Sequence, residues 1–255
     1  MNSIAERHKY ILEQLQTKGF VEVQALADEL NVTGATIRKD LRVMEDQKLL
    51  IRSHGSATLV KPPVFDQNSS EKALKHSNEK NLIAKAASKL ISSYDAIMLT
   101  SGSTIIAFAK AIPSDDNINI VTSSLEIAIL LKERKNVNVM ILGGRVYKSS
   151  MSVRGPYAED GVKHINCSKL YIGCDGIDLE KGITCASIEE VRLIQVMMSR
   201  TSKMIVLADS SKFGKSGFGR ICGIEDVDII ITDSGIPDAI REEIEEKGVQ
   251  VIIAQ

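Results

Sequence analysis

The sequence contains no tryptophan, and aromatic side chains account for only 4% of its 255 residues. Modules that recognise RNA or single-stranded nucleic acid stack aromatic rings on the bases, so this composition disfavours an RNA-binding protein. An excess of charge of one sign is also lacking, because 33 acidic residues offset 32 basic ones and leave a formal net charge of −1. A nucleic-acid partner would therefore require a locally basic surface.

Cysteines are few and show neither a CxxC pair nor histidines at ligand spacing, so nothing indicates a metal or another cofactor; they are Cys167, Cys174, Cys185 and Cys222. Long apolar runs are missing too, since those such as Ile229 to Ile231 fall far short of the ~20 residues that span a bilayer. No basic stretch followed by an apolar run opens the sequence. These absences predict a cytoplasmic protein with reduced, mostly buried thiols and no membrane segment.

The composition that is present, 44% apolar and 25% charged, is typical of a globular protein with ample material for a core. The hydrophobic spacing changes near residue 60. Before that point the pattern predicts a helix, a short strand, a helix, a tight turn, a third helix at 34–47 and a two-strand hairpin around 53–56. Lys61-Pro62-Pro63 then breaks regular structure. We expect a first domain over residues 3–60 and a linker over 61–70.

The helix expected at 34–47 has an apolar face formed by Ile37, Leu41 and Met44 and a basic face opposite. Residues 33–61 carry six basic side chains against three acidic ones, whereas residues 1–32 carry three against five. Basic side chains on the exposed face of a small helical module are often only solvated. The order of elements, however, is that of a winged helix-turn-helix, which reads the major groove. The candidate DNA contacts are Thr33, Thr36, Arg38, Lys39, Arg42, Arg52 and His54.

From residue 71 to residue 255 the pattern becomes apolar strands alternating with amphipathic helices. This predicts an α/β domain with a mostly parallel sheet that is covered on both faces. The strands are expected at 95–100, 118–122, 137–142, 169–174, 203–209, 227–233 and 249–254, and the helices at 80–92, 104–111, 124–134, 187–201 and 237–247.

In such sheets, ligands bind beyond the carboxyl ends of the strands. The loops that follow five of the expected strands are rich in small, hydroxyl-bearing or charged residues that suit a phosphate or sugar hydroxyls. Each loop alone is more often a plain turn, but all leave the same predicted edge, so together they predict a site for a small polar anion. The candidate effector contacts are Ser101, Gly102, Ser103, Thr104, Thr122, Ser123, Gly143, Gly144, Arg145, Asp175 and Lys212.

Residues 6–58 resemble the N-terminal domain of the DeoR family of regulators, most specifically in the segment VTGATIRKDL and the wing IRSHGSA. The resemblance implies that residues 33–42 are the recognition segment and that the wing at His54 approaches the DNA backbone or the minor groove. Two positions depart from the family pattern. Ser56 stands where a second glycine is usual, and Thr33 stands where serine is commoner.

Residues 75–235 resemble the sensor domain of the same family through EKNLIAKAA, TSGST, VTSS, ILGGR, GCDGID, GIT and LADSSKFGK, in order and spacing. That domain is similar in fold to ribose-5-phosphate isomerase, which implies a phosphorylated sugar or polyol as effector. The family often has a lysine in the helix after GIT, where this chain has Glu189, Glu190, Val191 and Arg192. Arg192 either fills that role or only covers the helix surface.

We therefore predict a DNA-binding regulator that is not an enzyme. By family habit it is a repressor of sugar or polyol metabolism genes, and it binds double-stranded operator DNA as a homo-oligomer, a dimer or a tetramer. The alternative is a sugar-phosphate isomerase fused to a DNA-binding module, with a carboxylate of the loop Asp175 to Asp178 moving a proton. The sequence lacks a lysine- and glycine-rich loop such as that enzyme uses, so no catalytic residue is assigned.

Overall fold

The computed structural model describes residues 4–18, 20–47, 49–53, 55–59, 69–113 and 117–255. The chain divides into two compact units, Met1–Pro62 and Pro63–Gln255. Helix α4 (Ser69–Leu74) begins two residues before the end of the linker expected at 61–70, so those two residues are helical instead. No helix in the described ranges has the length and apolarity that a membrane span requires.

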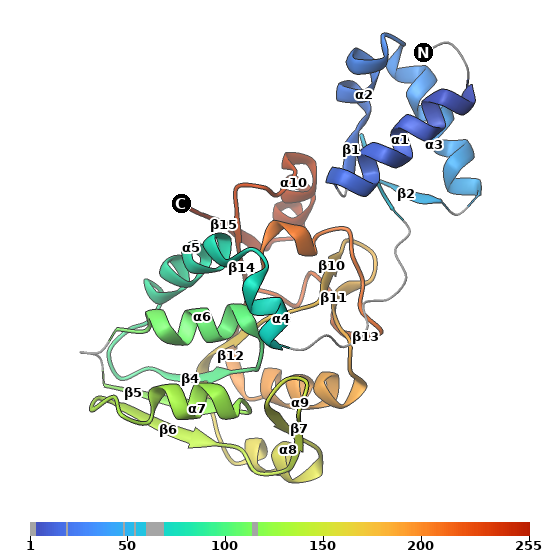
Figure 1. The fold of residues 1–255 in the computed structure, drawn as a ribbon. Coiled ribbons are helices and arrows are strands. Elements are labelled where there is room, and N and C mark those ends of the chain that lie inside the picture. The colour runs from blue at the N-terminus through green and yellow to red at the C-terminus, as the bar shows by residue number, and fades with distance from the viewer. Residues whose placement is uncertain (1–3, 19, 48, 54, 60–68, 114–116) are drawn as a thin grey trace. The chain divides into compact units, whose positions relative to one another are not determined.

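The first unit contains three helices and a small antiparallel sheet in the strand order β1-β3-β2. One apolar core joins the helices to the sheet, and its least exposed members include Ile11, Leu15, Ile37 and Met44. This is the arrangement of a winged helix-turn-helix. The elements are α1 (Ile4–Lys18), β1 (Phe20–Glu22), α2 (Val23–Leu30), α3 (Gly34–Asp46), β2 (Leu50–Ser53) and β3 (Ser56–Leu59) (Figure 1).

The second unit is built on a parallel sheet of seven strands in the order β15-β14-β12-β9-β4-β5-β6. All seven strands lie where the apolar runs predict them. They are β4 (Ala96–Leu99), β5 (Ile118–Thr122), β6 (Val137–Ile141), β9 (Cys167–Ile172), β12 (Thr201–Leu207), β14 (Ile229–Asp233) and β15 (Gln250–Ala254).

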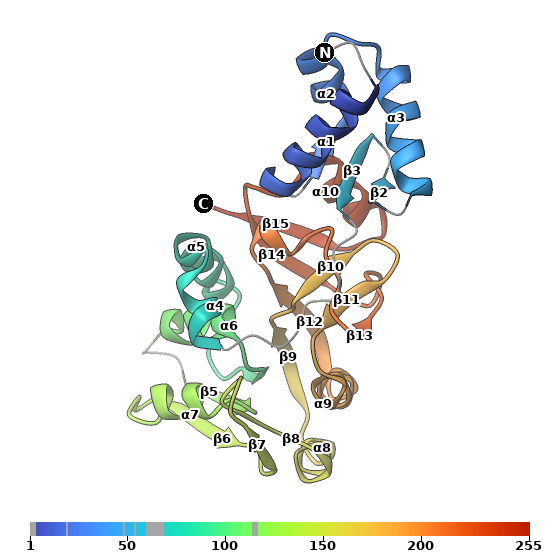
Figure 2. The ribbon, with the colours of Figure 1, turned by 45° about the vertical axis from the view of Figure 1, so that its right-hand side comes forward.

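Helices cover both faces of this sheet (Figure 2). Alternate strand residues point to opposite faces, so Ile97 and Leu99 pack with α5, α6 and α7, whereas Met98 belongs to the core on the side of α8, α9 and α10. The helices are α5 (Ser77–Ser88), α6 (Ser103–Ala111), α7 (Leu125–Leu131), α8 (Pro156–Lys163), α9 (Ile188–Met198) and α10 (Asp238–Glu246).

Helices α4 and α8, of six and eight residues, were not expected from the sequence. Five short strands were not expected either, because three or four residues show too little periodicity to be recognised. These strands form a hairpin of β7 and β8 and a small antiparallel sheet in the order β10-β11-β13. Their bounds are β7 (Arg145–Tyr147), β8 (Ser152–Arg154), β10 (Gly176–Asp178), β11 (Gly182–Cys185) and β13 (Gly219–Cys222), with a 3-10 turn η1 at Ser210–Lys212.

The direction in which the sheet is built reverses between β4 and β9. The chain runs outward from β4 through β5 to β6, and it then returns to β9, on the other side of β4, before continuing to β12, β14 and β15. A reversal of this kind opens a crevice beyond the carboxyl ends of the two central strands. The fold therefore places the loops that follow β4 and β9 beside each other.

Candidate functional site

The recognition helix α3 is well defined at its start. The hydroxyl of Thr33 accepts a hydrogen bond from the Thr36 N–H at 3.2 Å and lies 2.9 Å from the Thr36 hydroxyl, so Thr33 caps the helix. The side chain of Arg38 extends back along the helix, with Nη1 3.5 Å from the place that a Cβ would take at Gly34. Exposed cations therefore line the outer face of α3, and they are Arg38, Lys39 and Arg42.

A buried ion pair fastens α3 to α1. Arg7 donates from Nε to Asp40 Oδ2 at 2.7 Å and from Nη2 to Oδ1 at 3.1 Å. The hydrogen bond to Asp40 raises the pKa of Arg7 despite the opposing effect of burial. Because Asp40 faces inward, it does not offset the positive charge on the outer face of the helix.

The wing is tied to the same helix through Arg52. Its backbone N–H and its Nε donate to the Glu45 carboxylate at 2.9 and 2.7 Å. The backbone hydrogen bond is the largest of the contributions that lower the pKa of Glu45. Arg52 is thus exposed, but its guanidinium is already paired with Glu45 within the first unit. His54, the remaining predicted DNA contact, lies outside the described residues.

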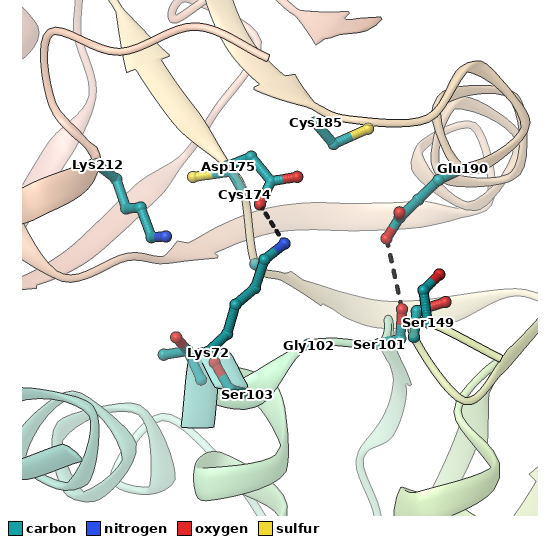
Figure 3. A pocket seen from close by; sticks show the side chains of 13 residues that line it. Lys72, Ser101, Gly102, Ser103, Ser149, Cys174, Asp175, Cys185, Glu190 and Lys212 are labelled. Carbon is teal, nitrogen blue, oxygen red and sulfur yellow. Dashed lines mark hydrogen bonds and ion pairs between the residues drawn. The ribbon is translucent and has the colours of Figure 1, made fainter. Parts of the chain in front are cut away.

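A pocket of about 60 Å³ opens at the carboxyl edge of the large sheet (Figure 3). The loops after β4, β9 and β12 form three of its sides, and the turn between β7 and β8, the start of α9 and helix α4 complete it. Its lining contains Lys72, Ser101, Gly102, Ser103, Thr104, Ser149, Ser150, Gly173, Cys174, Asp175, Cys185, Glu190 and Lys212.

The pocket brings together part of the predicted effector set, namely Ser101, Gly102, Ser103, Thr104, Asp175 and Lys212. Thr122 and Ser123 do not line it. They are buried, with the Thr122 hydroxyl accepting from the Ser124 N–H at 3.1 Å, and the Ser123 carbonyl accepting from the Val153 N–H at 2.8 Å. The β7–β8 hairpin covers this loop, so the small residues after β5 serve packing and the capping of α7.

The pocket lining also excludes Gly143, Gly144 and Arg145. These residues lie at the start of the β7–β8 hairpin, at the end away from the pocket. The Arg145 side chain is exposed, with its guanidinium carbon 5.8 Å from the centre of the Tyr147 ring. The far end of the hairpin is what reaches the pocket, through Ser149 and Ser150. Nothing in the sequence pattern distinguishes those two serines from ordinary turn residues.

Charged groups of both signs face the pocket. Lys72 Nζ lies 2.8 Å from Asp175 Oδ1, while Asp175 Oδ2 accepts from the Ala186 N–H at 2.9 Å. The Lys212 ammonium has no hydrogen bond or ion pair to any residue in the described ranges. In Figure 3 both lysines lie on the Asp175 side of the pocket, away from Glu190. This side can therefore receive an anion.

Sequence reasoning missed Glu190, which lies on the opposite side of the pocket with Ser101 and Ser149 (Figure 3). Its carboxylate is 2.9 Å from Nη2 of Arg154, a side chain that is almost entirely buried, and 3.4 Å from the Ser101 hydroxyl. Arg192 is exposed and does not line the pocket. At the start of α9 the pocket thus has a carboxylate that is ion-paired with a buried guanidinium.

Two thiols, those of Cys174 and Cys185, line the pocket, but neither is activated as a nucleophile. Burial raises the pKa of Cys185 to about 12 and also raises the pKa of Cys174, so both are neutral at physiological pH. All four cysteines are free. No group of three or more His, Cys, Asp or Glu suited to a metal ion occurs in the part of the chain that the structure describes. The pocket therefore offers hydrogen bonds and charge for binding.

Two family models match the chain, one over each unit. Residues 7–62 match a DeoR-like helix-turn-helix domain, and residues 75–234 match the DeoR C terminal sensor domain. Among solved structures, the chain is similar to ribose 5-phosphate isomerase A from Neisseria gonorrhoeae, with 19% identity, a TM-score of 0.40 and 53% of each chain covered. It is also similar to eIF2B delta from Chaetomium thermophilum, with 14% identity, a TM-score of 0.44, and 59% of this chain and 56% of that one covered.

Curated relatives match along nearly their whole length. An uncharacterized HTH-type transcriptional regulator, YulB of Bacillus subtilis, is 34% identical over 97% of this chain and 96% of its own. The HTH-type transcriptional regulator GlpR of Haloferax volcanii is 33% identical over 97% of both. The transcriptional repressor AccR of Agrobacterium fabrum is 31% identical over 94% of this chain and 96% of its own. These relatives are regulators and not enzymes, and the chain belongs to the DeoR family of transcriptional regulators.

Proposed function

We propose that this regulator represses genes of sugar or polyol metabolism and that a phosphorylated sugar or polyol, bound in the sheet-edge pocket, controls its affinity for operator DNA. The observation that carries the proposal is the convergence of the loop 101–104, Lys212 and Lys72 on one small pocket at the point where the sheet reverses. Ligands bind at such reversal points in open α/β sheets.

The loop 101–104 suits a phosphate group. It ends a central strand and starts α6, a nine-residue helix, with Gly102 at φ 125° as its N-cap residue. Backbone N–H groups at a helix start and nearby hydroxyls bind phosphate oxygens, and the helix dipole favours the negative charge. The unpaired Lys212 ammonium would supply a compensating cation.

The rest of the pocket suits a polyhydroxyl chain. Asp175 and Glu190 offer carboxylate oxygens, and Ser149 and Ser150 add hydroxyls. Carboxylates and hydroxyls accept hydrogen bonds from sugar hydroxyls, whereas an apolar ligand would make no hydrogen bond with them. The chemistry of the lining therefore favours a ligand with a phosphate at one end and hydroxyls along its length.

The winged helix suits double-stranded DNA. Arg38, Lys39 and Arg42 lie exposed on α3, where they can neutralise phosphates or reach base edges, and the capped start of the helix carries the Thr33 and Thr36 hydroxyls. Arg52 and His54 extend the predicted contact set to the wing. A homo-oligomer, either a dimer or a tetramer, would present paired recognition helices to repeated half-sites. Repression is supported by the name of the relative AccR, a transcriptional repressor.

A ligand screen on the full-length protein tests the sensor function. Sugar phosphates and polyol phosphates are compared with their unphosphorylated parents by thermal shift, where a ligand at 100 times its dissociation constant adds about 2.7 kcal/mol of stability. To obtain an operator, duplexes that the protein binds are first selected from a random pool. A compound that stabilises the protein should then release it from the selected duplex. Stabilisation by no phosphorylated compound, or equal stabilisation by the unphosphorylated parents, would overturn the proposal.

A pair of lysine variants locates the binding site. Lys212→Ala removes the unpaired cation of the pocket, so it should weaken the binding of the active compound about 10-fold or more and leave operator binding unchanged. Lys203→Ala removes an exposed lysine from the first part of β12, away from the carboxyl edge, and should alter neither. Equal ligand affinity in the two variants would place the ligand elsewhere.

A further inference from the structure

The β7–β8 hairpin carries a buried arginine next to the sensor pocket. Arg154, the last residue of β8, has a side chain that is only 2% accessible. Its guanidinium carbon lies 4.8 Å from the centre of the Tyr147 ring, which belongs to the other strand of the hairpin. A charge buried this deeply is costly unless an opposite charge accompanies it. Arg154 therefore requires a carboxylate close by.

Glu190, in the first turn of α9, supplies that carboxylate. Its Oε2 lies 2.9 Å from Nη2 of Arg154, and its side chain is 21% accessible. The same nitrogen donates to the Ser150 hydroxyl at 2.9 Å. Glu190 and Ser150 both line the pocket, whereas Arg154 does not. A ligand in the pocket would therefore meet the carboxylate and not the guanidinium behind it.

The ion pair also determines what Glu190 can offer to a ligand. Nε and Nη1 of Arg154 have no hydrogen-bond partner among the residues that the structure describes, so the guanidinium depends on Glu190 for the compensation of its charge. An ion-paired carboxylate carries no proton. It accepts hydrogen bonds from hydroxyl groups, and it repels a second anion.

The pocket thus has two ends of different chemistry. In Figure 3, Lys212 and Asp175 lie on one side and Glu190 and Ser101 on the other. A phosphate group would bind on the side of Lys212, because a place beside Glu190 would bring two anions together. The far end of the same ligand would then face Glu190. A hydroxyl group there can donate a hydrogen bond to the carboxylate, whereas an ionised acid cannot.

We propose that the Arg154–Glu190 pair determines which phosphorylated compounds the pocket accepts. It admits a phosphate ester whose far end carries hydroxyl groups, and it rejects one whose far end is a carboxylate or a second phosphate. This rests on the proposed function for the phosphate end of the ligand, but it adds a rule of selectivity and the residues that impose it. Glu190 contacts the ligand, and Arg154 acts through Glu190 as a positioning residue. Like charges placed against the wrong ligand are a common source of specificity.

Two ligands that differ only at the far end test this rule on the full-length protein. The best compound of the ligand screen is compared with the acid of the same carbon chain, for example glucitol phosphate with phosphogluconate, or glycerol phosphate with phosphoglycerate. Each pair exchanges one terminal CH₂OH group for a carboxylate. By titration calorimetry we expect the polyol phosphate to bind about 10-fold more tightly or better. Equal affinities, or a preference for the acid, would overturn the rule.

Neutral variants show whether the ion pair causes the preference. Glu190→Gln keeps an oxygen that accepts from Arg154 and removes the negative charge, so the acid should bind about 10-fold more tightly than it binds to the parent. The double variant Glu190→Gln, Arg154→Met has no charge at this end, and its affinities for the two compounds should differ by less than about threefold. A purely structural role of Arg154 would not make the gain for the acid depend on its guanidinium.

Glu189→Gln is the matched control, because Glu189 is the preceding residue of α9, is exposed and does not line the pocket. It should keep the preference of the parent. The double variant leaves no buried charge without a partner, so it serves even if Glu190→Gln is unstable. A folded double variant that still prefers the polyol phosphate by the parent's factor would show that the pair does not set the selectivity. The absence of any phosphorylated ligand for the parent would instead overturn the proposed function, and this rule with it.

Discussion

Arg7 and Asp40 form a two-point ion pair across the contact between α1 and α3, with side chains only 10% and 6% accessible. His8 of the same helix lies 3.4 Å from the second carboxylate oxygen of Asp40. The pair joins residues that are 33 positions apart and fixes the rotation of α3 about its own axis. That rotation decides whether Arg38, Lys39 and Arg42 face outward.

Removal of the Asp40 carboxylate should destabilise the winged helix strongly. Asp40→Ala leaves the Arg7 guanidinium buried without its partner, which costs about 3–5 kcal/mol. Hydrogen exchange at the amides of α3 in the full-length protein measures this loss locally. Glu13→Ala is the matched control, since it disrupts an exposed pair with Lys9 at 4.0 Å and should cost only about 0–1 kcal/mol. Equal protection in the parent and Asp40→Ala would contradict the account.

The elements that the sequence predicts well are those with strong periodicity. The apolar runs that became β4, β12 and β14 are continuous because both faces of a parallel sheet are buried. Ile37, Leu41 and Met44 recur at helical spacing because α3 buries one face, and all three are at most 1% accessible. Such patterns can be recognised in a single sequence, because each buried position is occupied by an apolar residue.

The pocket was predicted only in part, because several of its residues depend on contacts between distant segments. Lys72 meets Asp175 across 103 positions, and no local pattern indicates such a contact. Thr122 and Ser123 follow a strand just as Ser101 does, but the short β7–β8 hairpin covers them, and its strands were too brief to be expected. The rule for sheet edges identifies the edge at which the pocket opens, but it does not show which loops of that edge line the pocket.

Arg38 should contribute to operator binding both directly and through counterion release. Arg38→Ala removes an exposed guanidinium from the outer face of α3 and should weaken binding by about 1–3 kcal/mol. If the contact is to a phosphate, the slope of log K against log salt should become shallower by about 0.9. Binding titrations over a range of salt measure both quantities. Lys9→Ala removes a lysine of α1 whose side chain is 79% accessible, and it should change neither the affinity nor the salt slope. If Arg38→Ala binds the operator with the affinity and salt slope of the parent, α3 does not contact DNA through this residue.

Gly144 should be required for the hairpin that brings Ser149 and Ser150 to the pocket. Its φ of 141° suits glycine alone, and a Cβ there would lie 2.7 Å from the Arg154 carbonyl oxygen. We expect Gly144→Ala to cost about 1–3 kcal/mol of stability and to weaken the response to the effector. The adjacent Gly143→Ala is a close control, since its Cβ would meet nothing within 4 Å. Denaturant unfolding of the two proteins should separate them clearly, and equal stabilities would contradict the close approach.

The sensor domain should lose stability in acid through Asp95, which joins the starts of β4 and β9. Burial alone would raise the pKa of this carboxyl, but hydrogen bonds from Lys169, the Ser92 N–H and the Ser168 hydroxyl outweigh it and lower the pKa. Such a group stabilises the fold above its unfolded pKa of about 3.9 and loses that contribution as the pH falls through the folded pKa. Asp95→Asn should therefore cost about 1.5–3 kcal/mol near pH 7 and much less near pH 3, by denaturant unfolding. The control is Asp238→Asn, because the Asp238 carboxylate is 82% accessible, and this variant should have the parent's stability at both pH values. If the cost of Asp95→Asn does not change with pH, the charge of Asp95 does not contribute to stability.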